Sequence, residues 1–167
     1  ILCLGDSVTA GLNVTSTDTY QAVVEDMLNN EFTETKFEVI NAGVSGYSSC
    51  QGIYMYKYKG KKFNPDIVTF YFGFNDPIRR FYLSDREIMQ PELPKIFKIF
   101  KNKYLLKLQS YRLLRKLIRD IFKKERGKNK KVRRVNKREF YNNINKLQQW
   151  CNNENTELIL ISSPFCK

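Results

Sequence analysis

The residues best suited to chemistry lie in three short polar motifs, the first of which contains a serine. It runs from Gly5 to Gly11 and includes Asp6 and Ser7. A serine hydroxyl can attack a carbonyl carbon, and the N–H groups at the start of a following helix can stabilise an anion. An isolated Gly-Asp-Ser sequence more often forms a turn whose serine caps a helix, so this motif carries little weight alone.

Two further motifs offer hydrogen-bond donors. Asn41–Ser48 contains Gly43 and Gly46, where the lack of a side chain lets the backbone approach a substrate and present an N–H group. Gly73–Asp76 contains Asn75, whose amide can donate to a developing oxyanion. Either motif could be an ordinary turn. Three motifs in this order, each directly after an expected strand, are much harder to obtain by chance.

Four short apolar runs are expected to be the strands that position these motifs. They are nearly continuous rather than alternating, as strands covered on both faces by helices should be. The runs are Ile1–Leu4, Phe37–Ile40, Ile67–Phe72 and Leu158–Ile161. Because parallel strands end at a common edge of a sheet, we expect Ser7, Gly46 and Asn75 to meet around one small hollow.

Helical patterns lie between the strands. One is expected over Asp18–Asn29, with Asp18 as the candidate N-cap, and a second from Ser48 or Ser49 to about Tyr58. The first has apolar residues at helical spacing (Tyr20, Val23, Val24, Met27, Leu28), and so does a third before the last strand (Tyr141, Ile144, Leu147, Trp150). The alternation predicts a three-layer α/β fold with a doubly wound parallel sheet.

Positive charge is concentrated in one segment. The 167 residues carry a net charge of +12, but residues 95–138 hold 19 basic residues against two acidic ones, a net charge of +17. The remaining residues hold 10 basic against 15 acidic, a net charge of −5. We expect residues 94–134 to form one or two basic amphipathic helices that pack their apolar face on the sheet and leave their charges in solvent.

Residues 95–138 have a second interpretation, which is contact with an anionic membrane or polymer surface. Nucleic acid is not favoured as a partner, because no recognised nucleic-acid motif is present. Liposome sedimentation at two salt concentrations would separate these interpretations.

The three motifs together resemble the SGNH hydrolases, also called the GDSL-type lipases and esterases. The resemblance is firm from Ile1 to Asp76 and loose at the last strand. It implies a flavodoxin-like fold, Ser7 as the nucleophile, and oxyanion donors at the Gly46 N–H and the Asn75 amide. It also implies a site without metal or cofactor, in which Asp6, Gly43, Gly73 and Asp76 line the substrate. The substrate would be an acyl ester of a lipid or a carbohydrate.

One family motif is absent. The D-x-x-H block supplies the base and the residue that orients it, and these residues contain no histidine at all. We therefore expect residues 1–167 to be a single partial domain, with the basic insertion at 94–134, that lacks its C-terminal strand and helix. Such a chain is expected to be inactive alone. The alternative is a non-catalytic carbohydrate- or lipid-binding relative that has lost the base.

Two other assignments are weaker. A lysine could replace the histidine, but no lysine adjoins a motif. Asp6 and Asp76 could form a carboxylate pair for acid–base or metal chemistry, although hydrogen-bonding roles at the edge of the sheet fit them better.

Overall fold

The computed structural model describes residues 1–81, 84–89 and 131–162. The chain forms two compact units, one made of Ile1–Ile78 with Arg133–Lys167 and the other of Arg79–Val132. Most of the segment 94–134, where the basic helices are expected, lies outside the described residues. The single-domain assignment therefore stays a prediction.

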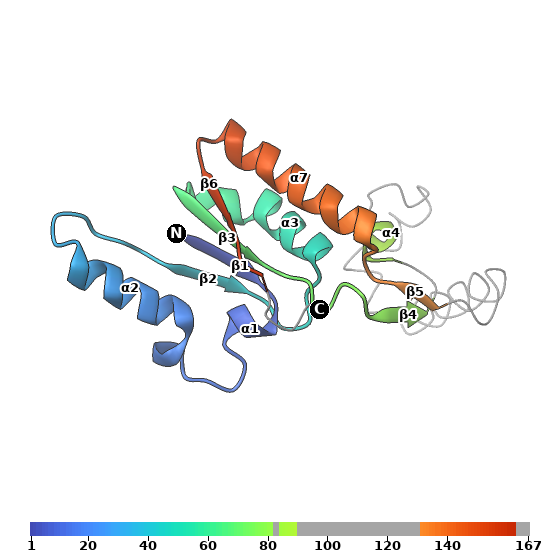
Figure 1. Cartoon of the computed structure of the whole chain (residues 1–167), viewed down its shortest axis with the longest axis horizontal. Coiled ribbons are helices and arrows are strands. Elements are labelled where there is room, and N and C mark those ends of the chain that lie inside the picture. The colour runs from blue at the N-terminus through green and yellow to red at the C-terminus, as the bar shows by residue number, and fades with distance from the viewer. Residues whose placement is uncertain (82–83, 90–130, 163–167) are drawn as a thin grey trace, which may run out of the picture. The chain divides into compact units, whose positions relative to one another are not determined.

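Four parallel strands form the sheet of the first unit (Figure 1). They are β1 (Leu2–Gly5), β2 (Ile40–Gly43), β3 (Ile67–Tyr71) and β6 (Glu157–Leu160). Their order is β2-β1-β3-β6, and Leu4 of β1 is paired with Ala42 on one side and Phe70 on the other. The predicted parallel sheet is confirmed, and β1 and β3 carry its buried core.

The second strand begins three residues later than predicted. Phe37 was expected to start it, but its N–H and C=O are both bonded to the side chain of Asn29, at 2.9 and 3.0 Å. The N–H of Val39 donates to the Glu25 carboxylate at 2.6 Å. The apolar run is thus bonded to a neighbouring helix, and pairing with β1 begins only at Ile40.

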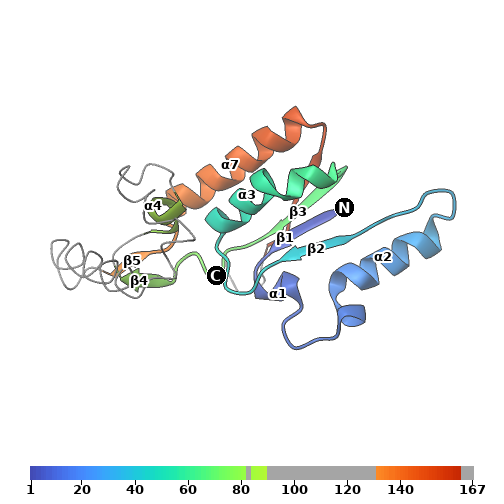
Figure 2. The same ribbon diagram turned by 180° about the vertical axis from the view of Figure 1, so that it is seen from behind.

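Helices cover both faces of this sheet (Figures 1 and 2). The helix α2 (Tyr20–Glu31) lies on one face, and α3 (Ser49–Tyr58) and α7 (Lys137–Asn153) lie side by side on the other. The core between the sheet and these last two helices includes Leu2, Leu4, Ile53, Tyr56, Val68, Phe70 and Leu147. This layering is the doubly wound arrangement that the sequence predicts.

The predicted details of α2 are wrong at two places. Thr19, not Asp18, caps the helix, and its hydroxyl accepts from the N–H of Ala22 at 3.4 Å. Val23 and Met27 are 47% and 65% exposed instead of facing the core. The buried position of this helix is Gln21, whose amide donates to the carbonyl of Thr9 at 2.7 Å, so α2 holds the short helix α1 (Ser7–Ala10).

The helix α3 begins where its predicted capping residues place it, whereas no cap was predicted for α7. Ser48 caps α3 as one of the two expected candidates, and Asn136 caps α7. On α7 the face turned to the core is Phe140, Ile144, Leu147 and Cys151, at a spacing of three and four residues. Tyr141 was expected on this face but is exposed, because it lies about 100° around the helix from Phe140.

The edge strand β6 departs from the expectation that both faces of every strand are covered. Ile159 and Leu160 are 43% and 52% exposed. Beside them lies an open hollow of about 620 Å³, bounded by Phe70, Phe72, Phe140, Ile144, Leu160 and Ile161 among others. The apolar composition of β6 is typical of a buried strand. Among the strands in the described residues, however, it has a neighbour on only one side, which is β3.

The second unit is described only in part. A two-stranded sheet pairs β4 (Arg79–Phe81) with β5 (Lys131–Arg133), and α4 (Asp85–Met89) follows Ser84. Ser84 and Glu87 cap the start of α4 reciprocally, since each backbone N–H is bonded to the side chain of the other residue.

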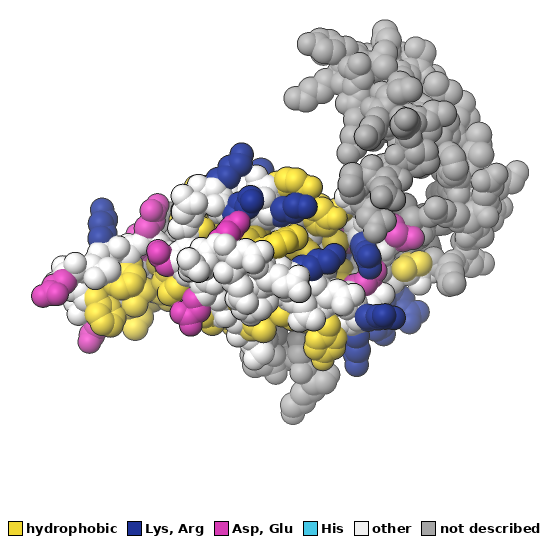
Figure 3. All heavy atoms as spheres, turned by 90° about the horizontal axis from the view of Figure 1, so that it is seen from above, with side chains coloured by type: hydrophobic (Ala, Val, Ile, Leu, Met, Phe, Trp, Pro, Cys, Tyr) yellow, Lys and Arg dark blue, Asp and Glu magenta, His cyan; other side chains and the backbone are white. Residues whose placement is uncertain are grey.

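The described surface has a mixed character. On the face shown in Figure 3, Lys and Arg side chains are interspersed with apolar and acidic ones. Within the described residues, every helix is too short or too polar to span a lipid bilayer.

Candidate functional site

Ser7 lies at the carboxyl end of β1, as the first residue of α1. Asp6 precedes it and is buried, and its Oδ1 atom accepts from the N–H of Val8 at 3.1 Å. Gly5 is required in this bend, because a Cβ atom there would lie 1.8 Å from Thr9 Oγ1. The tight bend leaves Ser7 half-buried at the edge of the sheet, while its neighbour Asp6 points inward.

The second motif forms a turn at the carboxyl end of β2. The N–H of Tyr47 donates to the carbonyl of Val44 at 3.1 Å, and the N–H of Val44 donates to Gly5 at 3.0 Å. Gly46 is the third residue of this turn and has a φ of +78°, which favours glycine. The hydrogen bond that closes the turn uses the Tyr47 N–H and not the Gly46 N–H.

The third motif connects the other two. Asn75 is 8% exposed, and its Nδ2 atom donates to the carbonyl of Tyr47 at 3.0 Å and to Asp6 Oδ2 at 3.3 Å. One amide therefore bonds the residue before Ser7 and the residue after Gly46. The structure brings the three motifs together at one edge of the sheet, as the sequence predicts.

Asp76 faces a different neighbour. Both of its carboxylate oxygens accept from the N–H of Ser49 at 3.2 Å, and the Ser49 hydroxyl donates to it as well. The side-chain amide of Asn143 lies 2.9 Å from that hydroxyl and so joins α7 to the same network. Asp76 thereby attaches the third motif to the start of α3. Asp6, by contrast, is bonded to α1 and to Asn75.

The two predicted substrate-lining glycines have different surroundings. A Cβ atom on Gly43 would lie 2.2 Å from the backbone nitrogen of Ala10, so this glycine lets β2 pack directly on α1. A Cβ atom on Gly73 would have no atom within 4 Å, and its φ of +137° is a conformation that only glycine adopts readily. Gly73 and Asp76 also border the apolar hollow beside β6.

Arg134 belongs to the site and is missed by the sequence analysis. It was expected among the solvated charges of residues 94–134, but it is 2% exposed. Its Nη1 atom donates to the carbonyl of Gly46 at 2.7 Å, and its Nη2 atom donates to Gln51 Oε1 at 2.6 Å. No signal in the sequence separates this arginine from its many basic neighbours.

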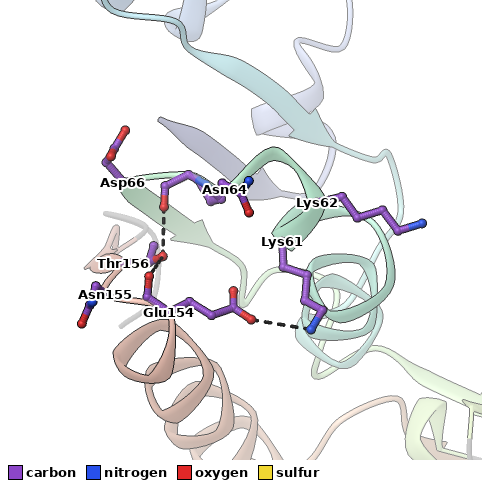
Figure 4. A pocket seen from close by; sticks show the side chains of 8 residues that line it. Lys61, Lys62, Asn64, Asp66, Glu154, Asn155 and Thr156 are labelled. Carbon is purple, nitrogen blue, oxygen red and sulfur yellow. Dashed lines mark hydrogen bonds and ion pairs between the residues drawn. The ribbon is translucent and has the colours of Figure 1, made fainter.

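Away from this edge of the sheet, the structure has a second, polar hollow. This hollow, shown in Figure 4, lies at the amino ends of β3 and β6 and is lined by polar residues such as Asn64, Asp66 and Thr156. Across it, Lys61 forms an ion pair with Glu154 at 3.6 Å. In the parts of the chain that the structure describes, no three Cys, Asp or Glu side chains are grouped so that they could hold a metal ion.

Comparison with protein families gives a match over nearly the whole chain. The model of the GDSL-like lipase/acylhydrolase family matches residues 3–157. A search of curated proteins found no match.

Solved structures give matches of lower identity. The crystal structure of TesA is similar with a TM-score of 0.56 and 18% identity, over 98% of this chain and 61% of that chain. A two-domain esterase (CEX) active on acetylated mannans has a TM-score of 0.43 and 30% identity, over 46% of this chain and 21% of that one. A catalytic mutant of Axe2, an acetylxylan esterase from Geobacillus stearothermophilus, has a TM-score of 0.40 and 18% identity, over 95% and 74%. The chain thus spans 61% of the length of TesA, and that likeness shows the fold alone.

Proposed function

Because the chain belongs to the GDSL-like lipase/acylhydrolase family, we propose that it forms the nucleophile and oxyanion part of a serine ester hydrolase. One observation carries this proposal. The Asn75 amide is bonded both to Asp6, which precedes the proposed nucleophile Ser7, and to Tyr47, which follows the proposed donor Gly46. These two bonds support the proposal, because they join Asn75 to the motif that contains Ser7 and to the turn that contains Gly46.

In the proposed reaction, the Ser7 oxygen attacks the carbonyl carbon of an ester, and a base takes the hydroxyl proton. The carbonyl oxygen becomes an oxyanion, which accepts hydrogen bonds from the N–H groups of Ser7 and Gly46 and from the Asn75 amide. Collapse of this intermediate breaks the bond to the alcohol, which leaves with the proton from the base. Water then hydrolyses the acyl-enzyme by the same steps.

The hydrogen bonds of Asn75 indicate how the oxyanion would be received. An amide NH₂ group has two hydrogens, and both are used, one by Tyr47 and one by Asp6. The bond to Asp6 is the longer one, at 3.3 Å, so it is the one expected to give way when an oxyanion arrives. Asp6 keeps its bond to the N–H of Val8 in that case.

The base is the component that these 167 residues lack, because they contain no histidine. A serine hydroxyl without a base is a poor nucleophile at neutral pH, and loss of a triad residue costs on the order of 10⁶ in kcat. We therefore expect little turnover from this chain alone. A longer chain that carries the D-x-x-H block is expected to hydrolyse esters.

The substrate we propose is an acyl ester of a lipid or a carbohydrate. Val8 and Phe74 are adjacent in sequence to Ser7 and Asn75, and they are 56% and 72% exposed. Such apolar side chains beside the motif residues are suited to contact with the acyl group. A series of p-nitrophenyl esters from acetate to octanoate would measure the preferred acyl length.

The direct test supplies the missing base from solution. The folded chain is incubated with p-nitrophenyl acetate and imidazole, and the rate above that of imidazole alone is measured. We expect this excess rate to be abolished in Ser7→Ala and retained in Ser16→Ala, a matched change in an exposed 3₁₀ turn. Mass spectrometry is expected to find the acetyl group on Ser7.

Equal rates for the wild type and Ser7→Ala, in both the imidazole assay and a chain with the D-x-x-H block, would contradict the proposal. Binding of a glycan or lipid ester without cleavage in that longer chain would instead favour the non-catalytic relative.

A further inference from the structure

The backbone of the buried residue Arg134 is held in place by hydrogen bonds. The N–H of Arg134 donates to the carbonyl of Ile78 at 2.9 Å, and the N–H of the next residue, Val135, donates to that of Asp76 at 3.0 Å. The backbone of this arginine is therefore bonded to the segment that follows the third motif. Its guanidinium projects from there toward the turn that contains Gly46.

The guanidinium connects that turn to helix α3. One nitrogen donates to the Gly46 carbonyl and another to Gln51 Oε1 in the first turn of α3. The same Gln51 oxygen accepts from the N–H of Ser48 at 3.2 Å, as part of the cap of α3. A planar guanidinium holds two acceptors in a defined mutual orientation, which a lysine ammonium cannot do. Both bonds are charge-assisted and therefore stronger than neutral ones.

These contacts hold the turn on both sides of the proposed oxyanion donor. The N–H of Val44 is bonded to Gly5 before it, and the carbonyl of Tyr47 is bonded to Asn75 after it. Arg134 adds a bond to the carbonyl of Gly46 itself. The Gly46 carbonyl and the Tyr47 N–H form one peptide group, which is bonded by Arg134 at one end and by Val44 at the other. The Gly46 N–H belongs to the preceding peptide group and is connected to this one through the torsions of Gly46. Glycine torsions are little restricted, so loss of the Arg134 bond would leave them freer to change.

We propose that Arg134 is a positioning residue: its bond to the Gly46 carbonyl restricts the torsions of Gly46 and thereby the direction of the Gly46 N–H. The catalytic part of this inference, the effect of Arg134 on the oxyanion, rests on the proposed function. Its geometric part, the restriction of the Gly46 torsions by Arg134, does not depend on any activity. The two parts can be tested separately.

The geometric part is tested by NMR of the chain labelled with ¹⁵N-glycine. The chain has eight glycines, and only Gly46 follows a serine, so additional labelling of serine carbonyls with ¹³C identifies its signal. We expect Arg134→Gln and Arg134→Lys to shift the Gly46 amide signal and to lower its ¹⁵N{¹H} NOE, because the torsions of Gly46 become less restricted. The matched control is Arg133→Gln, which removes an exposed charge one residue away and should leave the signal in place.

The fold of each variant is checked by its circular dichroism and by the other glycine signals. If Arg134→Gln does not fold, Gln51→Leu provides the second variant, because it removes the other acceptor and should loosen the guanidinium in the same direction. An unchanged Gly46 signal and ¹⁵N{¹H} NOE in a folded Arg134→Lys or Gln51→Leu variant would overturn the proposal.

The catalytic part is tested in a chain that carries the D-x-x-H block. We expect Arg134→Gln to lower kcat by about 10²-fold with KM changed less than about twofold, because the lost alignment matters only for the oxyanion. Added guanidinium ion is expected to restore part of the loss. A folded Arg134→Gln enzyme with unchanged kcat would refute the positioning role, even where the Gly46 signal moves. Absence of any Ser7-dependent turnover would refute the proposed function, and the NMR result would still decide whether Arg134 restricts the torsions of Gly46.

Discussion

Asn75 shows how a single side chain can organise a site before a substrate arrives. Its amide bonds the first motif at Asp6 and the second motif at Tyr47, and it is nearly fully buried. The residue proposed to stabilise the oxyanion therefore also aligns the loops that carry the other proposed donors. Loss of the amide should affect both alignment and charge stabilisation.

Asn75→Ala is expected to lower kcat by about 10²–10³-fold, because one oxyanion donor is removed and two loops lose their common partner. The measurement is kcat for a p-nitrophenyl ester in a chain that carries the D-x-x-H block. Asn145→Ala, at an exposed position of α7, is the matched control and should keep full activity. A folded Asn75→Ala enzyme with kcat within about threefold of the wild type would remove Asn75 from the oxyanion site.

At the scale of elements, close packing of β2 on α1 sets the distance between the first two motifs. Gly43 ends β2, and the backbone of Thr9 and Ala10 occupies the space that a side chain on Gly43 would need. Backbone atoms cannot move aside as the end of a flexible side chain can. The glycine is therefore required by packing, whether or not it also contacts the substrate.

Gly43→Ala is expected to destabilise the fold by about 1–3 kcal/mol, since the added methyl group must push α1 away from the sheet. Urea denaturation followed by circular dichroism measures this change in the free energy of unfolding. Gly46→Ala serves as a comparison, because its Cβ would meet no atom within 4 Å and its cost would come from the positive φ alone. Unchanged stability in Gly43→Ala would show that α1 is not packed on β2 as described.

For the whole molecule, burial of ionisable groups makes the free energy of unfolding depend on pH in the alkaline range. Burial raises the pKa of Tyr20 from 10.0 to about 12, although its hydrogen bond to Thr9 opposes part of the shift. Burial likewise raises the pKa values of Tyr56 on α3 and of the Cys151 thiol on α7, which are in contact where these two helices pack together. All three groups are therefore harder to ionise in the folded state than in the unfolded chain.

The free energy of unfolding is expected to be constant with respect to these groups below about pH 8 and to fall as pH rises from there toward 12. The sign follows because the unfolded chain releases these protons first, so above its pKa values the folded state binds more protons than the unfolded state. Urea titrations at pH 8, 10 and 11 measure the slope. Tyr20→Phe should make the decrease shallower, and an identical slope in that variant would show that Tyr20 does not contribute.

The sequence alone predicts the parallel sheet, the helices between its strands and the three motifs at one edge. These features are local, because apolar runs, capping residues such as Ser48 and glycine-containing turns act through neighbours in the chain. The limits of the strands were predicted less well. The side chains of Asn29 and Glu25 are bonded to the backbone of residues 37–39, so β2 begins only at Ile40.

Only the tertiary structure decides which polar residues support the site. Arg134 is far from Gly46 in sequence and lies in a strongly basic segment, so its composition predicts a solvated charge. Burial and two short hydrogen bonds give it a different role. The same holds for the bond of Asp76 to Ser49 and for the exposed edge of β6, because long-range contacts depend on how the whole chain is packed and leave no periodic signal in the sequence.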